Sequence, residues 1–460
     1  MESEIQHLHS KKHFYSKVLR IGLPMAFAQL MTSLLSLIDT FMVSGLGDTA
    51  VAAVGVSVSF MFLLIMMEFG FFSGLSIFFA QYWGSKDIKN IHKVFIIAAF
   101  IGTILTSLFF VLGFFFTDTV ISVFNNSGDA ENKAILLSYG RSYLKIASFS
   151  YFTMSITFLI GMLMRSVERV VYPQLVNIFA VLLNTLLNYL LIHGNLGFPE
   201  LGVQGAAIAT LISSFIGMTL LVGYVLISKE EVFKIRFRLY KDITKEFVHK
   251  IFRKALPVAI NETIWGLGMT FYLIAYGFIS TSSIASIHIT NQVMGLVWAV
   301  NAGISGASAI MLGNKLGENQ LDLAKKWGNW FMKLIFVAGL VFGVSLFIAS
   351  DYIASVFDES TDVAKDVSMI LKVFAFYVPI KFNNAYHIIG SLRSGGDTKY
   401  ALFAEVGPLW LVGVPLAFIL AINTELPLYV IVAIVNIEEI MKLLLLIPRF
   451  FTYKWVKNLT

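Results

Sequence analysis

The chain has 460 residues, of which 57% are hydrophobic and only 13% charged, and its mean hydropathy is +0.78. Soluble domains carry about 25% charged residues, so the composition excludes an ordinary soluble protein and predicts an all-α integral membrane protein. The chain contains no Cys, which excludes disulfides and thiolate metal sites. None of its eight His has metal-ligand spacing within the predicted spans, so we expect no membrane enzyme and no bound cofactor.

Twelve apolar stretches are long enough to cross a bilayer, which takes about 20 residues in a helix. In chain order we predict spans at residues 18–43, 50–80, 94–116, 140–164, 171–193, 203–228, 255–279, 283–312, 329–349, 368–391, 401–422 and 427–448. Residues 1–16 are polar and are expected to form a short tail with no cleavable signal peptide.

The positive charge alternates between successive connections. The two tails and every second loop carry nearly all of the loop Lys and Arg, whereas the other six connections hold only Lys133 and Lys365. Because basic loops stay in the cytoplasm, this pattern predicts a multi-pass protein of the plasma (inner) membrane with both termini cytoplasmic. Because nearly all of the loop Lys and Arg lie in the predicted cytoplasmic connections, membrane topology accounts for the formal net charge of +6. We therefore expect a lipid bilayer as partner and no nucleic acid.

The predicted spans repeat. Residues Lys17 to Phe124 align without a gap with Lys250 to Phe357, and the identical pairs include Pro24/Pro257 and Gly70/Gly303. Two similar six-span halves that run in the same direction are typical of transporters built from parallel repeats. The predicted organisation is therefore a tail (1–16), an N-lobe (17–228), a basic cytoplasmic linker (229–254), a C-lobe (255–448) and a second tail (449–460), with a pseudo-two-fold axis along the membrane normal.

Four polar residues of the first half fall at a similar depth. At 1.5 Å per residue, Asp39 lies about 9 Å from the outer end of its span, Asn188 about 8 Å, Asn184 about 14 Å and Thr210 about 10 Å. Asn184 and Asn188 are four residues apart and therefore share one helix face. Oxygen ligands of this kind suit a hard cation such as Na⁺, and a buried carboxylate suits a proton equally well.

A structural interpretation competes with this ion site. Asp39 could sit near the interface while the amides hold helices together, as polar groups do in membrane bundles. The repeat favours the ion site, because the second half has Tyr272 in place of Asp39 and no Asn pair in the span that corresponds to the fifth. Structural contacts would be expected in both halves, whereas a functional site needs to exist only once.

Further intramembrane polar groups are candidates for a second ion site or for substrate contacts, since an acid within a span needs a reason. Glu262, which aligns with Gln29 of the first half, is either such a site or a hydrated acid near Arg253 and Lys254. Glu405 is similarly placed, and Glu438, Glu439 and Lys442 are expected to be structural. The remaining candidates are Glu68, Tyr272, Asn383 and Asn384.

Three segments resemble the multidrug and toxic compound extrusion (MATE) family of the multidrug, oligosaccharidyl-lipid and polysaccharide flippase superfamily. They are Asp39-Thr40-Phe41-Met42 with the Gly45 to Gly55 segment that follows, Asn184 to Asn188 leading into Gly202 to Thr210, and Arg393 to Tyr400 with Trp410 and Pro415. The resemblance covers roughly residues 15–450. It implies two six-helix lobes, alternating access, and a first-lobe cation site at Asp39, Asn184, Asn188 and Thr210.

The resemblance also implies the function. We expect a secondary antiporter that exports amphipathic or cationic organic compounds in exchange for Na⁺ or H⁺, acts as a monomer and needs no other cofactor. The alternative is a lipid- or glycan-precursor flippase of the same superfamily, which would require a basic cavity for anionic pyrophosphates. Within the spans the sequence offers chiefly Lys381 for that purpose, with Arg141, Lys145 and Lys372 near helix ends.

Overall fold

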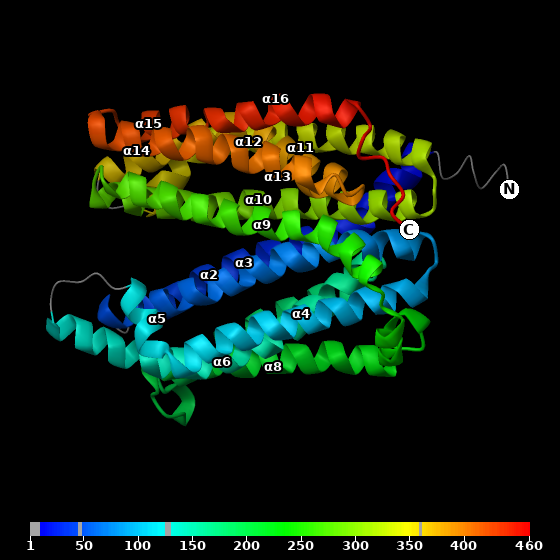
Figure 1. The fold of residues 1–460 in the computed structure, drawn as a ribbon. Coiled ribbons are helices and arrows are strands. Elements are labelled where there is room, and N and C mark those ends of the chain that lie inside the picture. Colours follow the sequence, from blue (N-terminus) through cyan, green and yellow to red (C-terminus); the bar gives the residue numbers. More distant parts are fainter. Residues whose placement is uncertain (1–9, 45–47, 125–129, 358–360) are drawn as a thin grey trace. The chain divides into compact units, whose positions relative to one another are not determined.

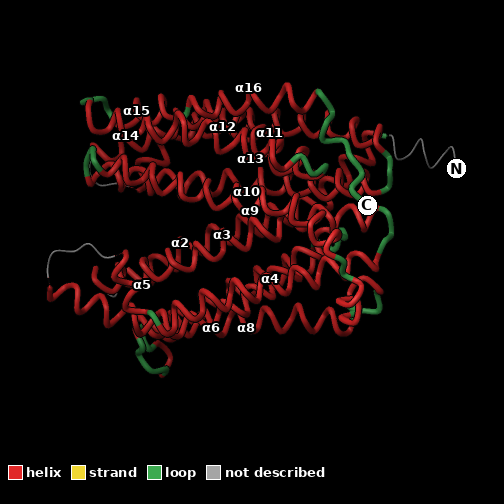
Figure 2. Tube along the Cα trace, viewed as in Figure 1, coloured by secondary structure: helices red, strands yellow, loops and turns green. Residues whose placement is uncertain are grey.

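The computed structural model describes residues 10–44, 48–124, 130–357 and 361–460, and every regular element in these ranges is helical (Figures 1 and 2). The α-helices of the first half are α2 (Lys11–Ser44), α3 (Asp48–Gly84), α4 (Ile88–Phe115), the short α5 (Thr117–Phe124), α6 (Ala130–Ser166), α7 (Val171–Ile192) and α8 (Gly202–Ile227). A short 3₁₀ turn, η1 (Asn195–Gly197), lies between α7 and α8, and two more, η2 (Glu231–Phe233) and η3 (Phe237–Asp242), follow α8.

The second half contains continuous and interrupted helices. In chain order they are α9 (Lys245–Gly277), α10 (Thr281–Gly317), α11 (Leu321–Phe357), α12 (Thr361–Ala385), η4 (Tyr386–Leu392), α13 (Thr398–Pro408), η5 (Leu409–Gly413), α14 (Val414–Asn423), α15 (Leu428–Val435) and α16 (Ile437–Phe451). Helix α9 begins at Lys245, so the last ten residues of the predicted linker are helical, and α2 begins at Lys11 inside the predicted tail.

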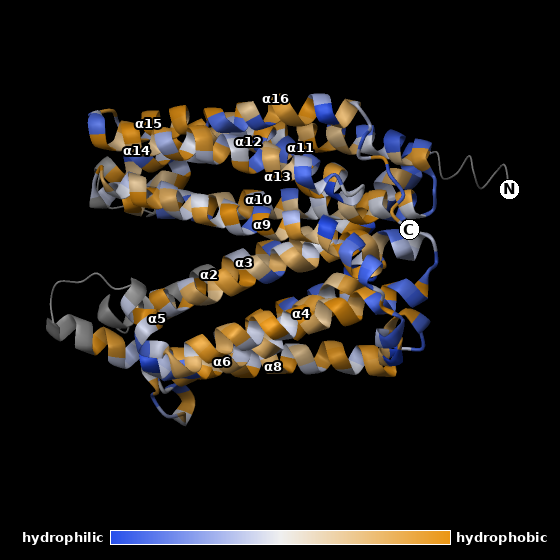
Figure 3. Ribbon diagram, viewed as in Figure 1, coloured by the Kyte–Doolittle hydropathy of each residue, from blue (hydrophilic) through white to orange (hydrophobic). Residues whose placement is uncertain are grey.

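The predicted twelve-helix membrane protein is confirmed. Ten helices in the described ranges are long and apolar enough to cross a membrane, and apolar residues run along their length (Figure 3). The other two crossings are α12 with η4, which carries Lys372 and Lys381, and the pair α15–α16. The latter is broken at Asn436, whose side-chain amide donates to the Val432 carbonyl at 2.7 Å.

Two helices of the second half widen into π-helical stretches, which the sequence pattern does not predict. η4 continues α12 and ends immediately before Arg393, and η5 joins α13 to α14 beside Pro408 and Pro415. A proline removes a backbone N–H donor, and π stretches are frequent at functional sites. Arg393 directly follows η4, so the geometry of this stretch sets the position of Arg393. η5 carries Trp410, whose indole donates to the Ile264 carbonyl of α9 at 3.1 Å.

Contacts divide the chain into two units. Unit 1 comprises Met1–Leu30, Ile77–Asp87 and Lys250–Thr460, and unit 2 comprises Met31–Ser76 and Ile88–His249. The ends of α2 and α3 thus pack with the second half, whereas the predicted lobes follow the sequence repeat. The lobe boundaries themselves stay a prediction, since the units group segments by packing and not by repeat.

Unit 1 contains a close helix crossing between α2 and α10. A Cβ at Gly303 would lie 2.6 Å from the Gly22 carbonyl oxygen, and one at Gly22 would lie 2.9 Å from the Gly303 oxygen, so only glycine fits on both helices. Small residues of this kind let helices approach in membranes, where packing has to replace the hydrophobic drive for association.

The termini of unit 1 meet at one end of its helices. Phe14 packs edge-on against Phe331 with ring centroids 4.8 Å apart. The Gln81 side chain, at the end of α3, accepts from the Leu459 N–H at 2.6 Å and donates to the Ser394 carbonyl at 2.7 Å. The N-terminal helix, the C-terminal tail and two of the predicted basic connections therefore share one end, as the charge alternation predicts.

Unit 2 is held by α6, which packs against α4, α5 and α8. Its core includes Phe60, Phe109, Ile121 and Leu144, while apolar residues on the outer faces of the same helices are exposed, as expected for lipid-facing surfaces. The segment after α8 folds back on α4, where Lys89 forms an ion pair with Asp242 at 3.0 Å.

Candidate functional site

The predicted amides and hydroxyl of the first half come together in unit 2. Asn184 Nδ2 donates to Thr210 Oγ1 at 3.4 Å, and Asn188 Nδ2 donates to Asn184 Oδ1 at 3.3 Å. Thr210 Oγ1 in turn donates to the Ala206 carbonyl at 3.0 Å. Asn188 is only 4% exposed. Three oxygen-bearing side chains from α7 and α8 thus form one polar chain inside an apolar unit.

The turn between α7 and α8 explains this meeting. The Leu201 N–H donates to the Leu191 carbonyl at 2.9 Å, and Gly205 lies so close to the Leu191 backbone that a Cβ would not fit. Two helices that start from such a close approach stay in contact, so Thr210, about two turns into α8, reaches Asn184 of α7.

The part of α2 that belongs to unit 2, from Met31 onward, lies beside α7. Asn177 Nδ2 donates to Thr32 Oγ1 at 3.1 Å, which links α7 to α2. Asp39 and Asn184 each follow this contact by seven residues, or two helical turns, and the first and fifth spans run in the same direction. Asp39 lies in α2, but its side chain is outside the described residues.

Glu68 is a buried acid of unit 2. It is 4% exposed, and its Oε1 accepts a hydrogen bond from Thr106 Oγ1 of α4 at 2.7 Å. Ser155 of α6 is a second hydroxyl partner. Glu68 therefore links three helices of the unit through hydroxyl groups, a role that its position in the sequence does not reveal.

In unit 1 the acids of the second half form a buried ionic network. Arg393 Nη2 donates to Glu262 Oε1 at 2.6 Å, with the side chains 4% and 12% exposed. Lys442 Nζ lies 2.8 Å from Glu438 and 3.4 Å from Glu439, and Lys381 Nζ lies 3.9 Å from Glu439. The structure thus joins the seventh, tenth and twelfth crossings through charged side chains.

The network corrects one alternative for Glu262. The sequence offers Arg253 and Lys254 as its neighbours, but Glu262 is buried and paired with Arg393, while Lys254 donates to the Gly396 carbonyl at 2.7 Å. Arg393 falls between the predicted spans 368–391 and 401–422, in a connection that the charge alternation predicts to be cytoplasmic. In the structure Arg393 follows the π-helical stretch η4, and its guanidinium is buried against Glu262. No simple pattern in the sequence predicts this burial.

The other candidates of unit 1 have different surroundings. Asn384 Nδ2 donates to Glu439 Oε2 at 2.8 Å, and Asn383 Nδ2 donates to the Pro379 carbonyl at 2.8 Å, so both amides are buried and bonded inside the unit. Tyr272 is half-buried, and its hydroxyl lies so close to Gly413 that a Cβ at this glycine would not fit. Gln29 is exposed.

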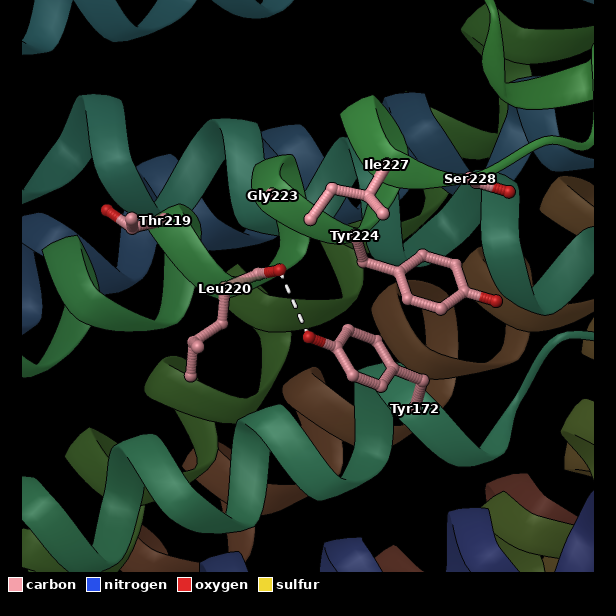
Figure 4. Close-up of a pocket in the computed structure, with 7 residues that line it drawn as sticks. All are labelled: Tyr172, Thr219, Leu220, Gly223, Tyr224, Ile227 and Ser228. Atoms are coloured by element: carbon pink, nitrogen blue, oxygen red, sulfur yellow. Dashed lines mark hydrogen bonds between the residues drawn. The ribbon is translucent and has the colours of Figure 1, made fainter.

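A shallow groove lies elsewhere, on α7 and α8 (Figure 4). Tyr172 stacks on Tyr224 with ring centroids 4.4 Å apart, and its hydroxyl donates to the Leu220 carbonyl at 3.1 Å. The remaining lining residues are Thr219, Gly223, Ile227 and Ser228. None of the predicted site residues lines this groove, and exposed Ile227 and Leu220 make it an ordinary apolar surface of the unit.

Comparison with known families decides the identity. The model that describes the MatE family matches residues 24–190 and again residues 257–419. The chain belongs to the MatE family. The two matches begin at the aligned prolines Pro24 and Pro257, so the family pattern is present twice, as the sequence repeat predicts. A member of this family is a multi-pass membrane transporter.

Relatives of this MatE protein match it over nearly its whole length. A probable multidrug resistance protein NorM from Thermotoga maritima is 24% identical over 459 residues, covering 96% of this chain and 93% of the relative. The probable multidrug resistance protein YoeA of Bacillus subtilis is 27% identical, covering 83% of this chain and 81% of the relative.

Solved structures show the same fold. A MATE protein crystallised in complex with MaL6 superposes with a TM-score of 0.85 at 19% identity, covering 95% of this chain and 96% of that chain. A transporter of the MOP superfamily from Pyrococcus furiosus, described as having a binding pocket of reversed polarity, gives a TM-score of 0.83 at 20% identity, covering 95% and 96%.

Proposed function

We propose that this MatE protein is a cation-coupled antiporter of the plasma (inner) membrane that exports amphipathic or cationic organic compounds. The relatives described as multidrug resistance proteins support the substrate class. The observation that carries the coupling is the polar chain of Asn184, Asn188 and Thr210 on α7 and α8. A cation that enters from outside binds this chain together with the carboxylate of Asp39.

The register of α2 supports a role for Asp39. From the Thr32–Asn177 contact, Asp39 and Asn184 are each two turns further along parallel helices, about 10 Å in both cases. Amide, hydroxyl and carboxylate oxygens are the ligands that Na⁺ and other hard cations accept, and the carboxylate also takes a proton. Either ion would bring a positive charge to the Asp39 carboxylate.

Coupling follows from linkage between the ion and the substrate. If ion binding at α2, α7 and α8 lowers the affinity for substrate, substrate binding lowers the affinity for the ion by the same factor. Ion entry from outside then favours substrate release to the outside. The exposed Gln29 is available to touch substrate, and Tyr272 only through its ring, because its hydroxyl is buried. Asn383 and Asn384 are bonded inside unit 1.

The flippase alternative is less well supported by the charges. Anionic pyrophosphate substrates need a surplus of basic groups, but the buried network of unit 1 has four carboxylates (Glu262, Glu405, Glu438 and Glu439) and three cations (Arg393, Lys381 and Lys442) among the described residues. The network therefore has no surplus of basic groups for an anionic pyrophosphate.

Transport into vesicles tests the proposal. Proteoliposomes are given an imposed Na⁺ or H⁺ gradient, and uptake of a cationic dye is followed for the wild type and for Asp39→Asn. We expect gradient-driven uptake that Asp39→Asn abolishes, with Asp322→Asn as control, since that carboxylate lies on the surface with 95% of its side chain exposed. Gradient-driven uptake by Asp39→Asn at the wild-type rate would refute the role of Asp39.

A further inference from the structure

Glu405 of α13 differs from the other acids of the buried network in its partner. Glu262 faces Arg393, and Glu438 and Glu439 both face Lys442. Among the described residues, the hydrogen-bond partner of Glu405 is the neutral side-chain amide of Asn261, which donates through Nδ2 to Glu405 Oε2. Glu405 is therefore the one carboxyl of the four that no cation of the network contacts.

The charges around Glu405 do not balance if all groups are ionised. Glu262 from α9, Arg393 after η4 and Lys442 from α16 act electrostatically on Glu405, and Lys442 is itself held by Glu438 and Glu439, with Lys381 beside Glu439. The described network then has four negative and three positive charges. An uncompensated buried charge is strongly destabilising, and one bound proton removes the excess negative charge.

Asn261 provides a second, independent indication. The residue is 2% exposed, and its Oδ1 is a buried acceptor with no hydrogen-bond donor among the described residues. An ionised carboxylate only accepts hydrogen bonds and cannot satisfy this oxygen. A protonated carboxyl both donates and accepts, so it can pair with both polar atoms of the same amide.

We propose that Glu405 and Asn261 form a proton-binding site in unit 1, in which the proton on the Glu405 carboxyl neutralises the ionic network and hydrogen-bonds to the Asn261 amide. The site lies on α13 and α9 and shares no residue with the cation site proposed on α2, α7 and α8. Glu405 is half-buried within α13. Loss of the proton leaves a net negative charge among α9, α13 and α16, so proton occupancy is linked to the packing of these helices.

Infrared titration in lipid nanodiscs tests the site directly. The absorbance of protonated carboxyl groups is measured against pH for the wild type, for Glu405→Gln and for the control Glu425→Gln, which changes an exposed acid between α14 and α15. Gln keeps one donor and one acceptor and so mimics the protonated acid. We expect Glu405→Gln to lose one protonated carboxyl per chain at neutral pH and Glu425→Gln to lose none. An unchanged carboxyl absorbance in Glu405→Gln would overturn the proposal.

Chemical labelling of the wild type gives a test that needs no variant. Dicyclohexylcarbodiimide reacts with protonated carboxyls in apolar surroundings, and peptide mass spectrometry locates the product. We expect labelling at Glu405 at neutral pH and none at Glu262, which is ion-paired. Labelling absent from Glu405, as would follow if water satisfies Asn261 and Glu405 is ionised, would refute the site. Repeating the measurement in Asp39→Asn separates the two sites, because Glu405 should be labelled equally there.

Discussion

Arg393 Nη2 and Glu262 Oε1 lie 2.6 Å apart although the two residues are 131 positions apart in the chain. The pair joins the middle of α9 to the end of the π-helical stretch η4, and both side chains are almost completely buried. It therefore fixes the place where the tenth crossing turns towards the eleventh.

Removing one member of this pair should destabilise the protein. Glu262→Gln or Arg393→Gln leaves the other charge buried without its partner, which typically costs about 3–5 kcal/mol. The double variant should lose much less than the sum of the two single losses, because neither charge is then stranded. Thermal unfolding of the four proteins in detergent measures this coupling. Additive losses would show that the pair does not act as a unit.

Asn188 should contribute to ion affinity. Asn188→Leu keeps the size of the side chain but removes the amide that donates to Asn184, so we expect ion dependence of transport to shift to about tenfold higher ion concentration, or about 1.4 kcal/mol. Asn423→Leu, at an exposed position at the end of α14, is the matched control. If both variants respond to the ion gradient as the wild type does, the amide pair is structural.

The close crossing of α2 and α10 should not tolerate a side chain. Gly303→Val introduces a Cβ that would lie 2.6 Å from the Gly22 carbonyl oxygen, and overpacking of this kind typically costs about 1–3 kcal/mol. The expected result is a lower melting temperature and lower yield in the membrane. Gly55→Ala is the control, since its Cβ meets nothing within 4 Å. Equal stability of the two variants would contradict the crossing.

Asp118, which lies in α5 between two spans, makes a prediction about pH through its ion pair with Arg141 at the end of the next span. Arg141 donates through Nε and Nη2 to the two oxygens of Asp118 at 2.9 and 2.7 Å, and these hydrogen bonds hold the pKa of Asp118 below its ordinary value. Because the folded pKa is lowered, the contribution to stability is present above the ordinary aspartate pKa and is lost as pH falls through the lowered value. Arg141→Gln should raise the pKa of Asp118, which NMR titration of labelled aspartate would detect. An unchanged pKa would exclude the contact in solution.

The sequence predicts the membrane class and the number of crossings because both depend on local hydropathy. It also predicts that Asn184, Asn188 and Thr210 meet, since helix periodicity and depth are one-dimensional properties. It does not predict that the twelfth crossing breaks at Asn436 or that the tenth and eleventh contain π-helical stretches. Those features depend on side chains competing for backbone groups and on prolines that neighbouring helices accommodate.

The sequence by itself determined the repeat, the alternation of basic loops and the face on which the two amides of α7 lie, because each is encoded in residue spacing along single segments. Only the tertiary structure decided which charges pair. Arg393 reaches Glu262, and Glu405 reaches Asn261 instead of a cation, through contacts between helices far apart in the chain. Such pairings depend on which helix faces which, and no pattern within one span carries that information.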